Sequence, residues 1–555
     1  MAKTKKAGSR RRAVPTPPPT RSELLRLSLV ILNRLRQQPG LPIRHIAAFA
    51  REFLHIVRGK SEVAAAAGDR RFADPAWTEK RWSNALVKVY LAASQEAYAL
   101  VQELELQGRD AYAARFLSMM LVEALAPSNN PFTNPVVMKS VRETRGRSLM
   151  RGLQHFLSDQ LDNAGLISMV DRSAFEVGRN VAATPGDVVF RNEVLELLQY
   201  RPQTEQVYSI PLMVVPPQIN KFYVLDLSPQ NSFVNYAVQQ GMQVFMVSWR
   251  NPGPEMRHLS MEHYVRALEE AHEAIMQITG SPKVSWKGLC AGGLTSAIAL
   301  GRYAHLKRLD TVNTLTLNVT LLDVAGMEKT NIGYFITPKA LKESCKRSEK
   351  EGVLYGHEMA KMFAWLRPND LVWNYWVNNY LMGKKPAAFD VLYWNSDSTR
   401  LPATLHKDFC DMVLNNELGK GEPYALSDAT VELSKVDVDS FVVAGRTDHI
   451  TPWDACYKSV HLLGGDSQFV LVNSGHIQTL VCPPGKGKAS YQTAEHLPED
   501  PHDWLEQSTP TTGSWWELWV KWISPRSGKR KPAPVAAGSQ KYPPLGAAPG
   551  TYVRE

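Results

Sequence analysis

The sequence lacks several features that would assign it to a common functional class. It has no run of about 18 uninterrupted apolar residues, the length needed to span a bilayer, so no transmembrane segment is predicted. It also lacks a phosphate-binding Walker loop, a dinucleotide-binding Gly-x-Gly-x-x-Gly unit and the metalloprotease signature His-Glu-x-x-His. We therefore expect no metal and no redox cofactor.

Cysteine is scarce as well. The 555 residues include five cysteines, which form no Cys-x-x-Cys pair and no metal-like cluster along the sequence. An odd number of separated cysteines is typical of a reducing compartment, which predicts a cytoplasmic protein. The five are Cys290, Cys345, Cys410, Cys456 and Cys482.

The stretch around the first cysteine contains the motif to which the other candidate functional residues are related. A short strand-like run leads into Gly288-Leu289-Cys290-Ala291-Gly292, and an Ala/Leu-rich segment suited to a helix follows. Glycines flank the nucleophile in the Gly-x-Ser-x-Gly elbow of α/β-hydrolases because the turn leaves no room for side chains. Cys290 stands where that motif has serine, and the backbone N–H of Ala291 would face an oxyanion. The alternative is a buried structural cysteine in a glycine-rich turn.

An elbow nucleophile needs an acid and then a histidine, each at the end of a later strand. Asp448 follows the strand-like run 440–445, and His476 follows the run 468–472. Open α/β sheets place their chemistry at the carboxyl ends of their strands. We therefore predict Asp448 as the acid and His476 as the base.

Other residues compete for these roles. Asp448 could instead cap a helix, as a lone aspartate after a strand often does. Asp323 also ends a strand-like segment and is a rival acid, whereas Asp454 looks like a helix-start residue. His449 directly follows the candidate acid and could not easily turn back to receive its hydrogen bond, so His476 is the better base.

The segments between these motifs predict an α/β fold. Strand-like runs at 212–215, 243–249, 284–286 and 314–322 alternate with helical runs such as 261–278, which argues for a parallel sheet covered on both faces. In hydrolases the loop after the strand that precedes the elbow supplies the second oxyanion N–H. Here that loop is 216–220, and we place the donor at Ile219 or Asn220.

The remaining regions complete the predicted organisation. Residues 1–21 are basic and proline-rich, so we predict a disordered, solvated tail rather than a hook for nucleic acid or an anionic surface. Apolar residues at helical spacing predict a helical N-terminal domain over 22–200. The catalytic domain covers 201–525, with an aromatic-rich cap insertion at about 326–430, and 526–555 form a mobile basic tail.

Several motifs together resemble polyhydroxyalkanoate synthase. They are the elbow 288–293, the segments 216–227 and 247–252, the segment 389–402 and the run Ser474-Gly475-His476-Ile477-Gln478, and they occur in the family's order. The match extends from about Phe72 to the C-terminus, and the opening segment has no counterpart that we can match. Length, the Cys-Ala-Gly-Gly elbow and the C-terminal tail resemble class II, which polymerises medium-chain 3-hydroxyacyl-CoA.

The resemblance implies an α/β-hydrolase core with a cap insertion, preceded by a mainly helical N-terminal domain. It implies that Cys290 carries the acyl group, with Asp448 as acid and His476 as base, and that 3-hydroxyacyl-CoA is the substrate. The coenzyme A belongs to the substrate, so no cofactor is expected. The expected partners are the growing polyester chain, the surface of polyester granules in the cytoplasm and a second copy in a homodimer, with no specific nucleic acid.

The sequence is also compatible with two other functions. One is a thioesterase or hydrolase with a cysteine elbow, against which the large helical region and the aromatic cap argue. The other is a non-catalytic granule-associated scaffold that uses the amphipathic N-terminus and the basic tails.

Overall fold

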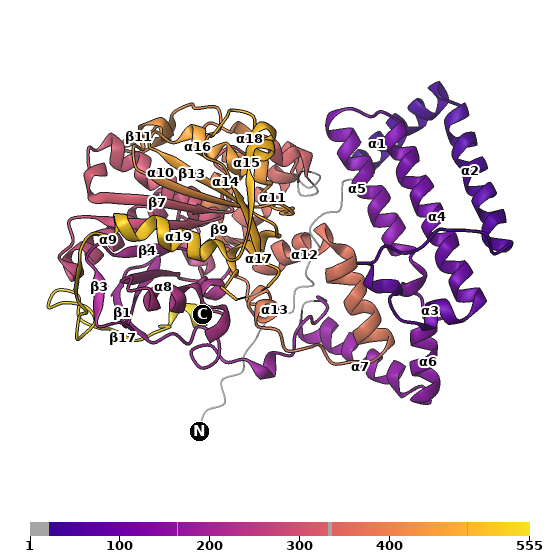
Figure 1. The fold of residues 1–555 in the computed structure, drawn as a ribbon, viewed down its shortest axis with the longest axis horizontal. Coiled ribbons are helices and arrows are strands. Elements are labelled where there is room, and N and C mark those ends of the chain that lie inside the picture. Colours follow the sequence, from indigo (N-terminus) through magenta and orange to yellow (C-terminus); the bar gives the residue numbers. More distant parts are fainter. Residues whose placement is uncertain (1–20, 164, 331–332, 334–335, 486) are drawn as a thin grey trace. The chain divides into compact units, whose positions relative to one another are not determined.

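The structure is a computed structural model that describes residues 21–163, 165–330, 333, 336–485 and 487–555. The chain divides into two compact units (Figure 1). One consists of the residues up to Met169 together with His357–Pro386, and the other of Val170–Gly356 together with Ala387–Glu555. The predicted tail over 1–21 lies outside the described residues, except for Arg21 at the start of a helix.

The described residues of the first unit are largely helical, as their apolar spacing predicts. The helical elements of this unit are α1 (Arg21–Gln37), α2 (Gly40–Val57), α3 (Ala76–Glu79), α4 (Arg81–Glu103), α5 (Gly108–Ala124), α6 (Pro135–Glu143), α7 (Arg147–Asp162), α12 (Gly356–Leu366) and the π-helical turns η10 (Asn369–Trp373) and η11 (Trp376–Leu381).

A late segment of the chain packs inside this unit. The η11 turn lies against α7, where a Cβ on Gly152 would come within 1.7 Å of the carbonyl oxygen of Tyr380. The Tyr380 hydroxyl donates to Asp159 at 2.7 Å, and the indole N–H of Trp376 donates to the carbonyl of Asn129 at 3.0 Å. The middle of the predicted cap insertion therefore belongs to the N-terminal helical unit.

The second unit is built on a large mixed sheet. Eleven strands of the described chain follow the order β15-β14-β13-β12-β7-β6-β4-β5-β2-β1-β17, and β5, β4, β6, β7, β12 and β13 form a parallel block. The parallel strands are β4 (Leu212–Val215), β5 (Val244–Trp249), β6 (Val284–Leu289), β7 (Val312–Asn318), β12 (Ser440–Gly445) and β13 (Ser467–Val472). The antiparallel strands are β1 (Gly186–Arg191), β2 (Leu195–Tyr200), β14 (Ser490–Thr493), β15 (Thr509–Thr512) and β17 (Gly546–Ala547).

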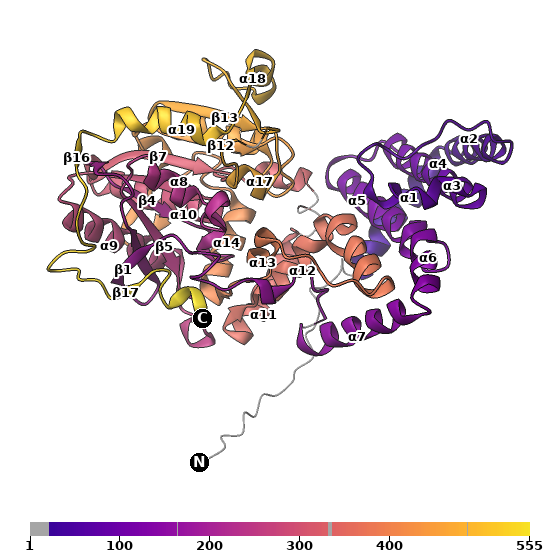
Figure 2. The same ribbon diagram turned by 60° about the horizontal axis from the view of Figure 1, so that its bottom comes forward.

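Helices cover both faces of this sheet (Figure 2). Two neighbouring residues of β6 identify the helices on each face, because successive side chains of a strand point to opposite sides of the sheet. The Trp286 indole donates to His272 of α9 (Met261–Thr279) at 3.0 Å, whereas Lys287 lies against the Trp519 ring of α19 (Trp515–Ile523). The predicted fold, an α/β-hydrolase-type sheet with a helical N-terminal region, is confirmed.

The second unit has further elements around the sheet. Helices α8, α10 and α13–α18 are Phe233–Gln239, Ala291–His305, Asp390–Asn395, Ala403–Asn415, Trp453–Tyr457, Ser459–Leu462, His476–Leu480 and Pro501–Gln507, and α11 is Pro338–Glu351. Small two-stranded sheets pair β3 (Gln206–Tyr208) with β16 (Arg530–Pro532), β8 (Val353–Leu354) with β9 (Leu401–Pro402) and β10 (Tyr424–Leu426) with β11 (Ala429–Val431). No helix of the described chain is both long and apolar enough to cross a membrane.

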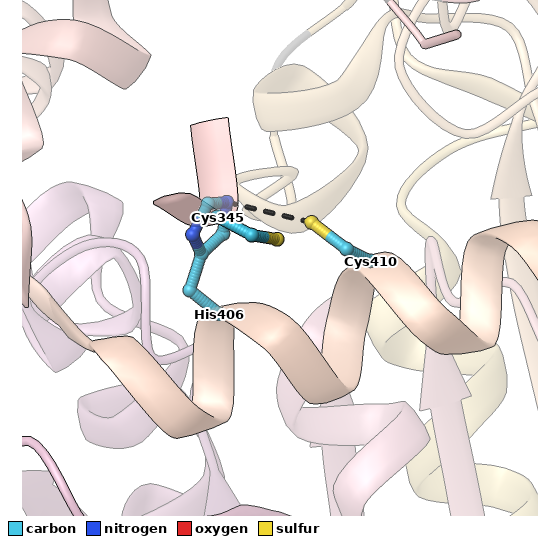
Figure 3. Close-up of side chains that lie close together, drawn as sticks. All are labelled: Cys345, His406 and Cys410. Carbon is cyan, nitrogen blue, oxygen red and sulfur yellow. Dashed lines mark hydrogen bonds between the residues drawn. The ribbon is translucent and has the colours of Figure 1, made fainter. Parts of the chain in front are cut away.

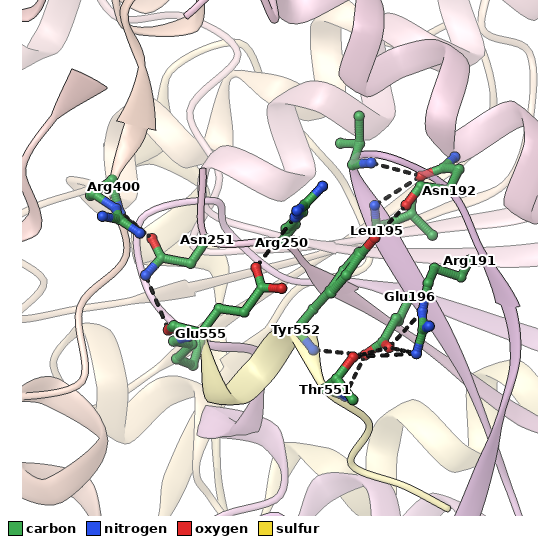
Figure 4. A network of polar contacts seen from close by, with 12 residues as sticks. Arg191, Asn192, Leu195, Glu196, Arg250, Asn251, Arg400, Thr551, Tyr552 and Glu555 are labelled. Carbon is green, nitrogen blue, oxygen red and sulfur yellow. Dashed lines mark hydrogen bonds and ion pairs between the residues drawn. The ribbon is translucent and has the colours of Figure 1, made fainter. Parts of the chain in front are cut away.

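The C-terminal segment is ordered, so the prediction of a mobile tail over 526–555 is wrong. Strand β16 pairs with β3 and β17 pairs with β1. The fully buried carboxylate of Glu196 accepts from the backbone N–H groups of Thr551 and Tyr552 at 2.9 and 3.0 Å and pairs with Arg191 (Figure 4). These contacts with distant residues hold a segment whose proline- and glycine-rich composition suggests mobility.

Candidate active site

Cys290 lies on the turn between β6 and α10. Its backbone has φ 49° and ψ −122°, a region that non-glycine residues seldom adopt. Its N–H donates to the carbonyl of Asn318 at 2.9 Å, and its own carbonyl accepts from the N–H of Gly293 at 3.0 Å. The predicted strand-turn-helix is confirmed, and the strained turn presents a partly exposed thiol at the end of the sheet.

The glycines around Cys290 are required by close backbone approaches. A Cβ on Gly288 would lie 2.5 Å from the Cα of Gly293. A Cβ on Gly292 would lie 2.3 Å from the carbonyl oxygen of Pro216 and 2.5 Å from that of Val215. The helix therefore packs directly on the end of β4, and the loop that follows β4 lies beside the elbow.

His476 and Asp448 meet at the same end of the sheet. Asp448 follows β12, and His476 opens α17 after β13. The Nδ1–H of His476 donates to Asp448 Oδ2 at 2.6 Å, and a second side-chain hydrogen bond links His476 to Cys290. Residues that are almost two hundred positions apart thus form a connected thiol, imidazole and carboxylate.

The electrostatics of this trio favour a charged imidazole. Burial, the largest influence, lowers the pKa of His476, but the charge of Asp448 and the hydrogen bonds to Asp448 and Cys290 together raise it to about 10. Burial likewise raises the pKa of the Asp448 carboxyl, but His476 and the hydrogen bonds from Thr451 outweigh burial and hold it below the ordinary value. The carboxylate therefore stabilises an imidazolium that has accepted a proton.

The alternative acids occupy other positions. Asp323 accepts from Lys458 Nζ and Asn416 Nδ2 at 2.7 and 2.8 Å. Asp454 lies in the first turn of α15, as a helix-start residue would. The alternative that Asp448 caps a helix is wrong: its Oδ1 accepts from the N–H groups of Ile450 and Thr451 in the loop before α15, whose N-cap residue is Pro452, while its Oδ2 binds His476.

Thr451 is a residue that the sequence analysis missed. Its hydroxyl donates to Asp448 Oδ2 at 2.7 Å and lies 3.2 Å from His476 Nδ1. Its N–H donates to Asp448 Oδ1 at 3.0 Å. The spacing Asp-x-x-Thr, in which an aspartate can accept from the residue three positions on, is the signal that could have identified it.

The structure brings the predicted oxyanion loop to the elbow. The amide of Gln218 donates to Thr295 Oγ1 of α10 at 2.9 Å, and Thr399 binds the loop carbonyls of Gln218 at 2.6 Å and Ile219 at 3.2 Å. Ala291 is the first residue of α10 and directly follows Cys290. Which of Ile219 and Asn220 faces the reacting carbonyl stays a prediction.

Comparison with known proteins agrees with this architecture. Residues 68–237 match the family model described as the poly-beta-hydroxybutyrate polymerase (PhaC) N-terminus, and residues 211–481 match the alpha/beta hydrolase fold. The chain is 47% identical to poly(3-hydroxyalkanoate) polymerase 2 of Ectopseudomonas oleovorans, over 92% of this chain and 90% of that protein.

Two further relatives match at similar coverage. Poly(3-hydroxyalkanoate) polymerase 1 of Ectopseudomonas oleovorans is 43% identical over 96% of this chain and 95% of its own length. The poly(3-hydroxyalkanoate) polymerase subunit PhaC of Cupriavidus necator is 37% identical over 92% of this chain and 87% of its own length. On the strength of these full-length matches, the chain belongs to the poly(3-hydroxyalkanoate) polymerase family and is a polymerising transferase on an α/β-hydrolase fold.

Proposed function

We propose that this polymerase builds its polyester from (R)-3-hydroxyacyl-CoA through an acyl thioester on Cys290, releasing coenzyme A. The observation that carries the proposal is a cysteine on the elbow, hydrogen-bonded to a histidine whose other ring nitrogen binds a buried carboxylate. This is the arrangement of an activated nucleophile, its base and the group that orients the base.

The first half-reaction loads the enzyme. His476 accepts the proton of the Cys290 thiol, and the sulfur attacks the thioester carbonyl of the substrate. The carbon–sulfur bond to coenzyme A then breaks, and the imidazolium returns its proton to the leaving thiolate. One thioester replaces another, so the acyl group keeps nearly all of its transfer potential.

The second half-reaction forms the polymer bond. A 3-hydroxyl from another substrate or from the growing chain gives its proton to His476, and its oxygen attacks the acyl carbonyl on Cys290. The new ester forms as the bond to sulfur breaks, and the sulfur takes back the proton. Asp448 fixes the tautomer of His476 in both halves and stabilises the cation.

The developing oxyanion is stabilised by backbone N–H groups in this proposal. Ala291 donates from the first turn of α10, and Ile219 or Asn220 donates from the loop after β4. Support comes from the close packing of Gly292 on the carbonyl of Pro216, which holds that loop beside the elbow. The chemistry uses a thiol, an imidazole and a carboxylate of the protein, and we propose that it draws on no metal or cofactor beyond the coenzyme A of the substrate.

A preference for medium-chain acyl groups, attachment to granules and formation of a homodimer are further parts of the proposal. The first follows from the likeness of the elbow and the tail to class II enzymes. Attachment to the surface of cytoplasmic polyester granules is supported by exposed apolar side chains on the first two helices, which suit an apolar surface. Those with exposed fractions of 51 to 68% include Leu29 and Leu32 of α1 and Ile43, Ile46 and Val57 of α2.

A product analysis tests the proposal. Purified protein is incubated with (R)-3-hydroxyacyl-CoA of short and medium chain length, and free coenzyme A, free acid and insoluble polyester are measured. We expect coenzyme A release matched by polymer, with a higher kcat/KM for medium chains. Release matched by free acid would instead identify a thioesterase, and no release would leave only a scaffold role.

A further inference from the structure

A cluster of metal-binding side chains lies between two helices of the second unit. Cys345 projects from α11, and His406 and Cys410 project from α14 towards it (Figure 3). One ligand atom from each residue lies within 4.8 Å of the other two. His406 and Cys410 are four residues apart and therefore share one face of their helix. The sequence alone shows no such cluster, because helix packing is what joins these residues, which are far apart along the chain.

A hydrogen-bonded serine sets the orientation of the imidazole. The Ser348 hydroxyl donates to the carbonyl of Cys345 at 3.0 Å, so its oxygen is left to accept from the Nδ1–H of His406 at 2.8 Å. The lone pair of His406 is therefore on Nε2, which lies 3.5 Å from the sulfur of Cys410. Metal-binding histidines are held in their tautomer by a partner of this kind on the second nitrogen.

The separation of two of the donor atoms fits tetrahedral zinc. Tetrahedral zinc takes sulfur at about 2.3 Å and nitrogen at about 2.0–2.1 Å, which places a ligating sulfur and nitrogen about 3.5 Å apart. The observed 3.5 Å between Cys410 Sγ and His406 Nε2 equals that separation. Two sulfurs and an imidazole are the donor types that zinc prefers, whereas magnesium and calcium prefer oxygen.

Burial and charge agree with this assignment. His406 and Cys410 are buried and Cys345 is partly buried, so an ion there would be largely shielded from water. Two thiolates neutralise one divalent zinc ion, so the filled site would bury no net charge. Three protein ligands leave one tetrahedral position for water.

We propose that Cys345, His406 and Cys410 bind one Zn²⁺ ion, which clamps α11 to α14. The site is separate from the polymerisation chemistry and does not depend on it. The site could influence the predicted oxyanion loop, because the segment leading into α14 contains Thr399, which binds the loop carbonyls of Gln218 and Ile219. Because the ion would join α11 to α14, zinc binding is expected to slow amide exchange in both helices.

A zinc titration tests the proposal. The full chain is reduced, stripped of metal and titrated with Zn²⁺ against a chromophoric chelator, in a Cys290→Ala background because Cys290 and His476 form another thiol–imidazole pair. We expect one tightly bound equivalent, which Cys345→Ser or Cys410→Ser abolishes and the matched control Cys482→Ser retains. Binding that is absent in this background, or unchanged by Cys345→Ser and Cys410→Ser, overturns the proposal.

Two further measurements separate ligation from misfolding of a variant. Ser348→Ala keeps all three ligands and is expected to weaken zinc affinity by about 10–100-fold. In the chain without these substitutions, Zn²⁺ is expected to protect Cys345 and Cys410, but not Cys482, from alkylation under mild denaturation, as read by peptide mass spectrometry. The proposed site is contradicted if Zn²⁺ protects all three cysteines equally, or if it protects neither Cys345 nor Cys410.

Discussion

The proposed role of Asp448 predicts a large kinetic defect in Asp448→Asn. An asparagine keeps the size of the side chain but removes the charge that, with the hydrogen bonds, raises the pKa of His476 to about 10. Burial is then opposed only by the hydrogen bond and the charge of Cys290, and the pKa of His476 is expected to fall towards its ordinary 6.5. That change removes about 5 kcal/mol of imidazolium stabilisation, at about 1.4 kcal/mol per pKa unit.

Proton transfer from Cys290 to His476 becomes less favourable by this amount, so kcat is expected to fall by about 10³–10⁴-fold. The assay measures coenzyme A release from saturating (R)-3-hydroxyacyl-CoA at neutral pH, with folding checked by circular dichroism. Asp323→Asn is the matched control, since that rival acid binds Lys458 and Asn416 instead, and its kcat is expected to change by less than about tenfold. A folded Asp448→Asn enzyme within tenfold of the parent would refute the assignment of the acid.

Four more predictions follow from particular contacts. Cys290→Ser keeps the elbow but replaces the thiol, so kcat for coenzyme A release is expected to fall by at least about 10³-fold. Gly292→Ala places a methyl group 2.3 Å from a backbone oxygen and should destabilise the fold by about 1–3 kcal/mol in urea, whereas Gly487→Ala, with open space around it, should change stability by less than about 0.5 kcal/mol. Glu196→Ala removes the acceptor of two tail N–H groups and the partner of a cation, so a loss of about 3 kcal/mol and faster amide exchange over 546–555 are expected. The Asp448–His476 pair is stabilising when the carboxyl is ionised and the imidazole is charged, so the difference in Tm between the parent and Asp448→Asn should be largest from about pH 4 to 6.5. It should shrink as the pH rises towards 10, or falls through the lowered pKa of Asp448; a difference that does not vary with pH would contradict the charge assignment.

The central strands and the triad could be predicted because their signals are local. Strands of a parallel block are largely buried on both faces, so β4, β5, β12 and β13 each contain an unbroken apolar stretch such as Val244-Phe245-Met246-Val247. The predicted run 314–322 extends too far, because the chain leaves the sheet after Asn318, where Val319 adopts a φ of 45°. Cys290, Asp448 and His476 each follow a strand-like run, and parallel strands bring their carboxyl ends together.

Features that depend on distant packing could not be predicted in this way. The C-terminal segment is held by Glu196, about 350 positions earlier, and by contacts of Glu555 with Arg250 and Asn251 (Figure 4). Nothing in the local composition of the segment indicates these partners. The thiol and imidazole cluster likewise appears only when α11 packs against α14, and residues 357–386 belong to the first unit through contacts with α7.

Direct observation of the acyl group on Cys290 would test the account most closely. An acyl-CoA without a 3-hydroxyl can load the enzyme but cannot extend a chain, so the loaded state should accumulate. After quenching in acid and proteolysis, mass spectrometry is expected to find the acyl mass on the peptide that contains Cys290, with one equivalent of coenzyme A released. Release of coenzyme A with the acyl group on another residue, or on none, would contradict the central claim.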